Sequence, residues 1–370
     1  MKDPFYGRTP YKLMIIRLND LTSLLHTLPV LRALKRRYPK TKISWLVDQR
    51  YLPLIENIDE LDEVIGFDWT TFSDKIGTLH GFWEAVGMVK DLIRHLREML
   101  LVGSFTFTSQ LRYSLLAFFS GARVRIGVKP GGFLNWALLN RRMKISVKRH
   151  NIERNLSVMG SIHADLTPVR LTLPLSFTYY EKGAALRKAL ELEGGSYVVL
   201  IPVSSTPIKQ WHAAGFAELA ERIEREQDLT PVLAWDAEEN EQAKPFRDAL
   251  TGKAKIVGPL ELGILANLFE HAAYVVGPDT GPLHLASTMG APVVGIYGPT
   301  DPKISGPYWK PYRIVQLDPE CKRRCYSLAE LPEGKCRCMD NLEAEKVFAA
   351  CSDLWNSFQE ENPLSASKTA

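Results

Sequence analysis

Short apolar runs alternate with amphipathic segments along almost the whole chain of 370 residues, and this alternation constrains the fold more than any other feature. In the first half, the apolar run 13–16 predicts a buried strand, and the leucine-rich pattern over 24–34 predicts a helix that stops at Tyr38-Pro39. Further strands are predicted at 43–47 and from residue 64, and helices near 82–101 and 114–119. Strands that alternate with helices indicate parallel sheets covered by those helices.

A second series of the same kind follows the extended, proline-bearing stretch 165–174. Strands are predicted at 198–202, 231–235, 256–257, 274–276 and 293–297, and helices at 215–225, 238–250, 262–271 and 283–289. We therefore predict an α/β protein with two Rossmann-like domains, residues 1–170 and 171–345, followed by a helix and polar tail at 346–370. Their parallel sheets are expected to face a central cleft, with ligands at the carboxyl ends of the strands.

Charge is unevenly distributed between the two halves. Residues 1–180 hold 26 Lys and Arg against 15 Asp and Glu, a net charge of +11, whereas residues 181–370 hold 20 against 27, a net charge of −7. The stretch 99–152 alone contains nine basic residues and no acidic one. Nucleic acid is not the expected partner, because the stretch lacks a recognisable binding motif and interleaved stacking aromatics. We expect the N-terminal domain to meet another kind of anionic partner.

The chain shows neither an export signal nor an apolar run of the ~18 residues that a membrane span needs. A cytoplasmic protein is therefore expected, with surface contact to a membrane allowed. The apolar stretch 133–139 followed by Arg141, Arg142, Lys144, Lys148 and Arg149 suits an apolar edge beside anionic headgroups. A buried helix with a solvated basic end explains the same stretch equally well.

Four of the five cysteines are crowded together, as Cys321, Cys325, Cys336 and Cys338. An odd number of cysteines without an export signal argues against a disulfide framework. Their spacing fits neither paired C-x2-C zinc ligands nor a ferredoxin pattern, so metal binding is the less favoured interpretation. Thiols that are close in space and stay reduced, or that oxidise reversibly, are the favoured one.

Two loops between predicted strands and helices carry residues suited to phosphate. In the stretch 277–284, a helix start can hold a diphosphate through its unpaired N–H groups and its dipole. Alternatively, Asp279 or Thr280 only caps the helix and Pro282 occupies its first turn. In the stretch 204–211, Lys209 beside hydroxyl groups can neutralise phosphate, although a solvated loop lysine is the commoner case.

The loop after the first strand carries a carboxylate. Asp20 is a candidate general base where the cleft is expected, or else an N-terminal helix cap. His26 is predicted to lie inside the following helix as a packed residue rather than a proton carrier. The stretch Tyr297-Gly298-Pro299-Thr300-Asp301-Pro302 is turn-forming by composition, which indicates its place but not its role.

Four motifs occur in a fixed order: Leu25-His26-Thr27-Leu28-Pro29, Phe119-Ser120-Gly121-Ala122-Arg123, Asp279-Thr280-Gly281 with His284, and the turn at 297–302. Together they resemble glycosyltransferase family 9, the ADP-heptose:lipopolysaccharide heptosyltransferases. The resemblance covers about residues 12–350. It implies a GT-B fold and inverting transfer of L-glycero-D-manno-heptose from ADP-heptose to the inner core of lipopolysaccharide, with no cofactor and no metal.

The same resemblance implies roles for individual residues. Asp279 would bind heptose hydroxyls, the amides from Thr280 to Leu283 would hold the diphosphate, and Lys209 would stabilise the leaving ADP. Glu239 or Glu241 would take the ribose. The full implied donor-binding set is Ser204, Ser205, Glu239, Asp279, Thr280, Gly281, Pro282, Leu283 and His284. The anionic lipopolysaccharide precursor is expected on the N-terminal domain, at Arg112, Arg141 and Arg142.

One departure from the family pattern concerns catalysis. The family has a Gly-Asp pair shortly before His-Thr-Leu-Pro, and its aspartate is taken as the base, whereas this chain has Thr22 and Ser23. A serine cannot accept a proton near neutral pH as a carboxylate does. The predicted catalytic residues are therefore Asp20 as replacement base, Ser23 and Lys209. A degenerate sugar-nucleotide-binding protein, or a GT-B transferase that uses another nucleotide sugar, remain the alternatives.

Overall fold

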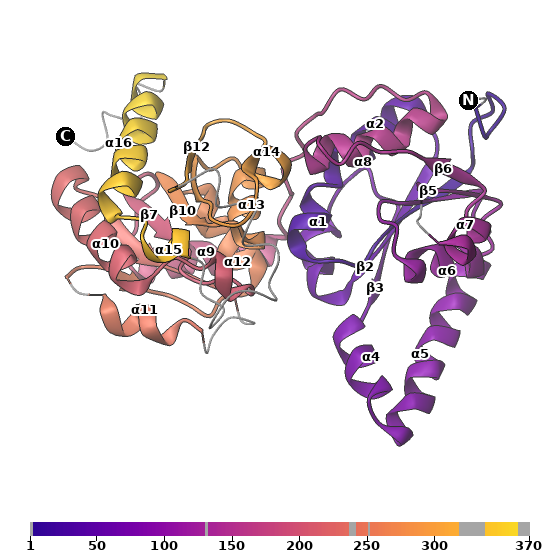
Figure 1. Cartoon of the computed structure of the whole chain (residues 1–370), viewed down its shortest axis with the longest axis horizontal. Coiled ribbons are helices and arrows are strands. Elements are labelled where there is room, and N and C mark those ends of the chain that lie inside the picture. The colour runs from indigo at the N-terminus through magenta and orange to yellow at the C-terminus, as the bar shows by residue number, and fades with distance from the viewer. Residues whose placement is uncertain (1–2, 130–131, 237–241, 251, 318–336, 362–370) are drawn as a thin grey trace. The chain divides into compact units, whose positions relative to one another are not determined.

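The structure, a computed structural model, describes residues 3–129, 132–236, 242–250, 252–317 and 337–361. The chain divides into two compact units, Met1–Pro174 and Leu175–Ala370, at the end of the proline-bearing stretch. Each unit is built on one six-stranded sheet whose strand pairs are all parallel, with helices packed on it (Figure 1). The predicted α/β fold with two Rossmann-like domains is confirmed.

The first unit orders its strands β3-β2-β1-β4-β5-β6. These strands are β1 (Lys12–Arg17), β2 (Lys42–Asp48), β3 (Glu63–Phe67), β4 (Gly103–Thr106), β5 (Val124–Val128) and β6 (Arg141–Met143). The helices are α1 (Leu21–Leu25), α2 (Leu28–Arg37), α3 (Leu52–Ile55), α4 (Trp69–Ile76), α5 (Leu79–Glu98), α6 (Leu111–Phe119), α7 (Phe133–Leu138) and α8 (Asn151–Met159). Because the strand order reverses between β1 and β4, the loops after these two strands diverge there and leave room for a ligand.

The predicted continuous helix over 24–34 is wrong, because α1 and α2 are separate helices with His26 and Thr27 between them. Pro29 occupies the first turn of α2, where its missing N–H costs nothing, whereas in a helix interior it would break the ladder. The Nδ2 atom of Asn155 donates to the carbonyl of His26 at 2.9 Å and to Oγ1 of Thr27 at 3.1 Å. These bonds satisfy polar groups that the break exposes. His26 is buried against the His150 ring, as a packed residue.

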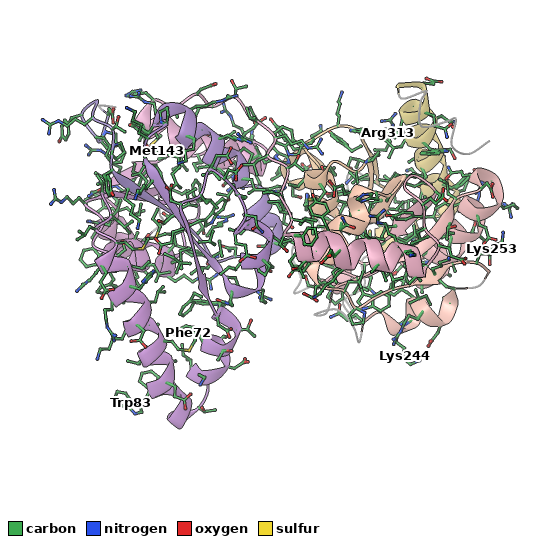
Figure 2. The ribbon with its side chains drawn as sticks, turned by 180° about the vertical axis from the view of Figure 1, so that it is seen from behind. Phe72, Trp83, Met143, Lys244, Lys253 and Arg313 are labelled. Carbon is green, nitrogen blue, oxygen red and sulfur yellow. The ribbon has the colours of Figure 1, made fainter. Side chains whose placement is uncertain are left out.

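Helices α4 and α5 form a hairpin that extends from the body of the first unit (Figure 1). At its base, the Phe72 ring lies 5.6 Å from that of Phe67 and 5.0 Å from that of Trp69. Near the turn, Trp83 is 72% exposed, and Figure 2 shows it at the outer end of the hairpin. The hairpin is therefore anchored by aromatic packing at one end and presents an apolar side chain to solvent at the other.

The second unit orders its strands β12-β11-β10-β7-β8-β9. These strands are β7 (Tyr197–Leu200), β8 (Thr230–Leu233), β9 (Lys255–Ile256), β10 (Tyr274–Pro278), β11 (Val293–Ile296) and β12 (Tyr312–Val315). The helices are α9 (Phe177–Ala189), α10 (Ala213–Gln227), α11 (Lys244–Ala249), α12 (Leu262–Glu270), α13 (Gly281–Met289), α14 (Pro302–Ser305), α15 (Arg337–Asp340) and α16 (Ala344–Glu361). Here the strand order reverses between β7 and β10, which places the second ligand position at their loops.

The last helices complete the core of the second unit. Cys338, Met339 and Cys351 are buried there beside Trp211, whose Nε1 donates to the carbonyl of Leu342 at 2.9 Å. Burial raises the pKa of the Cys351 thiol well above its ordinary value, which favours the protonated thiol over the thiolate. In the part of the chain that the structure describes, no helix is long and apolar enough to cross a membrane.

Candidate active site

The polar loops of the second unit meet where its strand order reverses. One loop follows β7 and carries Ser204, Ser205 and Lys209, and the other follows β10 and carries Asp279 and Thr280. Close packing between these two strands requires Gly277, because a Cβ there would lie 2.9 Å from Cβ of Ile201. The sequence motifs at 204–211 and 277–284 are thus brought together, although 70 residues separate Lys209 from Asp279.

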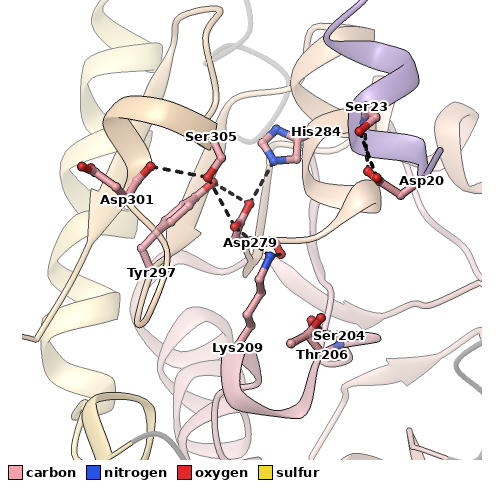
Figure 3. A network of polar contacts seen from close by, with 10 residues as sticks. All are labelled: Asp20, Ser23, Ser204, Thr206, Lys209, Asp279, His284, Tyr297, Asp301 and Ser305. Atoms are coloured by element: carbon pink, nitrogen blue, oxygen red, sulfur yellow. Dashed lines mark hydrogen bonds and ion pairs between the residues drawn. The ribbon is translucent and has the colours of Figure 1, made fainter. Parts of the chain in front are cut away.

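Asp279 is the centre of a buried polar network (Figure 3). Its Oδ2 atom lies 3.0 Å from Nζ of Lys209 and accepts from Oγ of Ser305 at 3.4 Å. Its Oδ1 atom lies 3.2 Å from Nε2 of His284 and accepts from the Tyr297 hydroxyl at 3.4 Å. Because an ionised carboxylate only accepts hydrogen bonds, Nε2 of His284 is the donor. Four side chains from three segments therefore fix the position of one carboxylate.

The same contacts set the protonation state of Asp279. Burial disfavours the ionised carboxyl, but the hydrogen bond from His284 and the charge of Lys209 outweigh it, so the pKa of Asp279 lies well below its ordinary value. The carboxylate is therefore ionised at neutral pH despite its burial, and it holds the ammonium of Lys209 in place. Lys209 keeps about a quarter of its side chain exposed, so it remains accessible to a ligand.

This depressed pKa predicts a specific acid response. Because the folded-state pKa of Asp279 lies below the unfolded value of about 4, its stabilising contribution is fully present above that pH and is lost as the pH falls toward the folded-state value. We expect Asp279→Asn to be less stable than the wild type at pH 7 and to approach it as the pH falls below about 4. Urea unfolding over a pH series measures this, and a constant difference between the two proteins would contradict it.

The start of α13 has no side-chain cap among the described residues. Thr280 is its N-cap residue, yet no side chain caps the helix, and Oγ1 of Thr280 is buried without a hydrogen-bond partner among the described residues. The interpretation that Asp279 or Thr280 only caps this helix is therefore wrong, whereas Pro282 does lie in the first turn. Unpartnered amides at the positive end of a nine-residue helix suit an anion. At the other end, Gly290 adopts a φ of 105° as the C-cap.

The two serines before Lys209 differ in their surroundings. Ser204 is buried and its Oγ accepts from the amide of Thr206 at 3.2 Å, whereas Ser205 is exposed. The hydrogen bond of Ser204 shapes the loop that carries Lys209, since Thr206 is the N-cap of the short turn Pro207–Lys209. Ser205 is the hydroxyl of this pair that a ligand can reach.

In the first unit, Asp20 is the N-cap of α1 (Figure 3). Its Oδ1 accepts from the amide of Ser23 and its Oδ2 from the Ser23 hydroxyl, both at 2.9 Å. The capping interpretation is thus confirmed, and the catalytic role stays a prediction. The Asp20 side chain is exposed and hydrogen-bonds directly to the position where the family pattern has its aspartate. The Asp20 carboxylate therefore lies next to residue 23, although residue 23 itself is a serine.

The predicted acceptor arginines lie on two different elements. Arg112, on α6, stacks on the Trp69 ring at 4.5 Å and on the Tyr113 ring at 5.1 Å. Arg141 and Arg142 lie on β6, the last strand at one edge of the sheet, where Arg142 stacks on the Trp136 ring at 4.0 Å. Among the described residues, no hydrogen bond, ion pair or ring contact joins Arg141 or Arg142 to Arg112.

Several predicted residues lie outside the described parts of the chain, namely Glu239, the alternative Glu241, Cys321, Cys325 and Cys336. Two residues of the Asp279 network were not predicted, Tyr297 and Ser305. Tyr297 begins the stretch 297–302, which the sequence predicts to be a turn of unknown role. Its position as the last of the four ordered motifs was the one signal in the sequence that linked it to the site. Within the described residues, no group of three or more His, Cys, Asp or Glu side chains is arranged to hold a metal ion.

The sequence model of glycosyltransferase family 9 (heptosyltransferase) matches residues 90–331, which is more than half of the chain. The chain belongs to glycosyltransferase family 9. The lipopolysaccharide core heptosyltransferase OpsX of Haemophilus influenzae is 23% identical over 369 aligned positions, which cover 95% of this chain and 99% of that relative. The chain therefore belongs to a family of glycosyltransferases that includes heptosyltransferases of the lipopolysaccharide core.

Solved structures agree with the family 9 assignment on the fold. The crystal structure of the family 9 glycosyltransferase from Veillonella parvula has a TM-score of 0.80 and 20% identity, with 94% of this chain and 98% of that chain covered. Escherichia coli heptosyltransferase WaaC with ADP has a TM-score of 0.70 and 19% identity, with 93% and 99% covered. The GT-B fold class predicted from the motifs is therefore confirmed.

Proposed function

We propose that this family 9 member is an inverting heptosyltransferase, which transfers L-glycero-D-manno-heptose from ADP-heptose to the anionic inner core of a lipopolysaccharide precursor. The observation that carries the proposal is the ionised Asp279 bound to Lys209 beside the uncapped start of α13. OpsX is named as a heptosyltransferase of the lipopolysaccharide core, and the structure of WaaC holds ADP. Both support the choice of donor and acceptor.

The donor site follows from this arrangement. We assign the diphosphate to the amides at the start of α13, because the helix dipole and unpartnered N–H groups favour an anion there. Lys209 shares its charge between Asp279 and the diphosphate, since its Nζ has three N–H donors. Asp279, held in one position, accepts from heptose hydroxyls, and Ser205 is a further contact.

The chemical step is a single displacement. The acceptor hydroxyl gives its proton to the Asp20 carboxylate as its oxygen forms a bond to the anomeric carbon of heptose. The bond from that carbon to the diphosphate oxygen breaks, and ADP leaves with the electron pair. Attack from the face opposite the leaving group inverts the anomeric centre. The charge that develops on the leaving diphosphate is stabilised by Lys209 and the α13 amides, which are already oriented before the reaction.

No metal or other cofactor is part of the proposed mechanism, because Lys209 and the helix start supply the positive charge that the leaving ADP requires. We expect the initial rate of heptose transfer to stay the same when the enzyme is assayed with an excess of EDTA. A control with added Mg²⁺ should give the same rate. A rate that falls with EDTA and returns with Mg²⁺ would contradict this part of the mechanism.

The acceptor is expected on the basic first unit, at Arg112, Arg141 and Arg142, where net charge favours an anionic partner. We place the reaction on the cytoplasmic side of the inner membrane, with peripheral contact through the segment 133–149. Trp136 is about half exposed beside the stacked Arg142, an amphipathic pair that suits a membrane surface.

Donor preference tests the proposal against its alternatives. The purified protein is titrated calorimetrically with ADP-heptose and with UDP- and GDP-sugars, each with and without an acceptor extract. We expect saturable binding of ADP-heptose, weaker binding of the others, and release of ADP only when acceptor is present. Tighter binding of a different nucleotide sugar would favour another GT-B transferase. Tight binding without ADP release would favour a degenerate binding protein.

A further inference from the structure

Arg17 is a buried cation for which the described residues supply neither a hydrogen bond nor an ion pair. As the last residue of β1 it is only 9% exposed, and its Nε is inaccessible and makes no hydrogen bond. No carboxylate of the described residues lies within ion-pair distance of it. Burial lowers the pKa of the Arg17 guanidinium, an effect that the charge of Asp20 partly offsets and that of Arg154 reinforces. Buried charges in proteins are normally paired, because removal from water is costly. A buried guanidinium without a direct ion pair therefore requires another explanation.

A second guanidinium whose Nε has no hydrogen-bond partner among the described residues lies at the start of α6. The Nε of Arg112 is also buried without a hydrogen-bond partner, while its guanidinium stacks on Tyr113 and Trp69. The Tyr113 hydroxyl donates to Oδ1 of Asn19, two residues after Arg17. This bond joins the loop after β1 to the start of α6, which follows β4. The two arginines thus flank the point where the strand order of the first unit reverses.

The corresponding reversal of strand order in the second unit holds a cation that is paired with a carboxylate. There, Lys209 and Asp279 meet across the reversal between β7 and β10, and each charge is paired. In the first unit, the end of β1 and the start of α6 bring two arginines, Arg17 and Arg112, to this point. Both carboxylate oxygens of Asp20 accept hydrogen bonds from Ser23. Among the described residues, neither arginine therefore has a carboxylate in direct contact at this point, and the residual exposure of Arg17 leaves it reachable.

We propose that Arg17, together with Arg112, binds an oxyanion of the acceptor next to Asp20, either the carboxylate of an acidic sugar or a phosphate. The planar guanidinium groups present pairs of N–H donors that match either anion. The assignment of this anion to the acceptor rests on the proposed function. Arg17 is then a positioning residue, which orients the attacking hydroxyl toward Asp20 and selects acidic acceptors.

Thermal unfolding tests the site without any transfer reaction. Wild type, Arg17→Met and the control Arg36→Gln, whose side chain is half exposed and paired with Asp165, are melted with glucuronate, glucose 1-phosphate or neutral glucose. We expect at least one of the two anions to raise the Tm of wild type and control through preferential binding to the folded state. Arg17→Met should melt higher than wild type without ligand and show no anion response, because it lacks the unpaired buried cation.

Each outcome decides the proposal. A response to glucuronate alone identifies a carboxylate site, one to glucose 1-phosphate alone a phosphate site, and either supports the proposal. An anion response in Arg17→Met equal to that of wild type would overturn it, as would a Tm below wild type, which indicates a structural role. Arg17→Lys should retain part of the response.

Transfer assays separate this inference from the proposed function. If wild type transfers no heptose but its anion response depends on Arg17, the proposed function fails and the anion site stands. If wild type transfers heptose and Arg17→Met does so with an unchanged KM for the acceptor, the anion site fails and the proposed function stands. The expected result is a raised acceptor KM in Arg17→Met, with the KM for ADP-heptose unchanged.

Discussion

Asp20→Asn is expected to lower kcat for heptose transfer by about 10²- to 10⁴-fold, the usual range for loss of a general base. Asparagine keeps the size and capping ability of the side chain, so α1 should stay intact and the KM values should change little. Initial rates at saturating ADP-heptose and acceptor measure the effect. Ser23→Ala is the matched control. It removes only the hydroxyl that donates to Asp20 and should change kcat far less.

The position of Ser23 offers a rescue. Because its hydroxyl lies 2.9 Å from Oδ2 of Asp20, a carboxylate introduced at residue 23 starts from nearly the same point of the loop. We expect Ser23→Asp to restore part of the activity when it is added to Asp20→Asn. Equal rates for wild type and Asp20→Asn would remove Asp20 from the mechanism. A large gain from Ser23→Asp alone would indicate that Asp20 is a poor base in the wild type.

Lys209→Met is expected to lower kcat by about 10²- to 10³-fold, the range seen when one preorganised electrostatic contact to developing charge is removed. Methionine keeps the length of the side chain but not its charge. Because the interaction strengthens as the diphosphate leaves, kcat and kcat/KM should fall together. Lys303→Met serves as the control, since Lys303 is exposed on α14 and makes no contact with Asp279 among those described.

Loss of Lys209 also leaves Asp279 with one fewer positive neighbour, so the variant must be shown to fold. Far-UV circular dichroism and ADP binding establish that the site persists. A folded Lys209→Met protein with wild-type kcat would contradict the role of Lys209 in stabilising the leaving group. A raised KM for ADP-heptose with unchanged kcat would do so as well, because it would indicate uniform binding of donor and transition state.

The fold could be predicted largely because most of its strands are apolar and β-branched. Continuous runs such as Val198-Val199-Leu200 are typical of strands buried on both faces, and β7 lies where that run predicts it. Strands β4, β5, β6 and β12 were not predicted. In β4, Ser104 and Thr106 are buried among apolar residues, which interrupts the apolar run. The break between α1 and α2 was missed because leucine periodicity continues through Pro29.

Site residues that belong to a sequence motif could be predicted. Residues that join the site only through the tertiary structure could not. Asp279 and Lys209 were singled out separately, and the structure joins them through the parallel pairing of β7 and β10. Tyr297 directly follows β11 and Ser305 ends α14, and the sequence between them shows mainly turn residues, which gave no sign that both contact Asp279. Arg17 gave no signal, because an arginine at the end of a strand is common, and only its burial without a partner distinguishes it.

One measurement tests the central claim most directly. The purified protein is incubated with ADP-heptose and a lipopolysaccharide precursor that lacks inner-core heptose, and the product is analysed by mass spectrometry and by NMR of the new anomeric centre. The account predicts that the precursor gains the mass of one heptose, with one ADP released per transfer and the anomeric configuration inverted relative to the donor. Retention of the donor configuration, or ADP release without a gain in precursor mass, would contradict it.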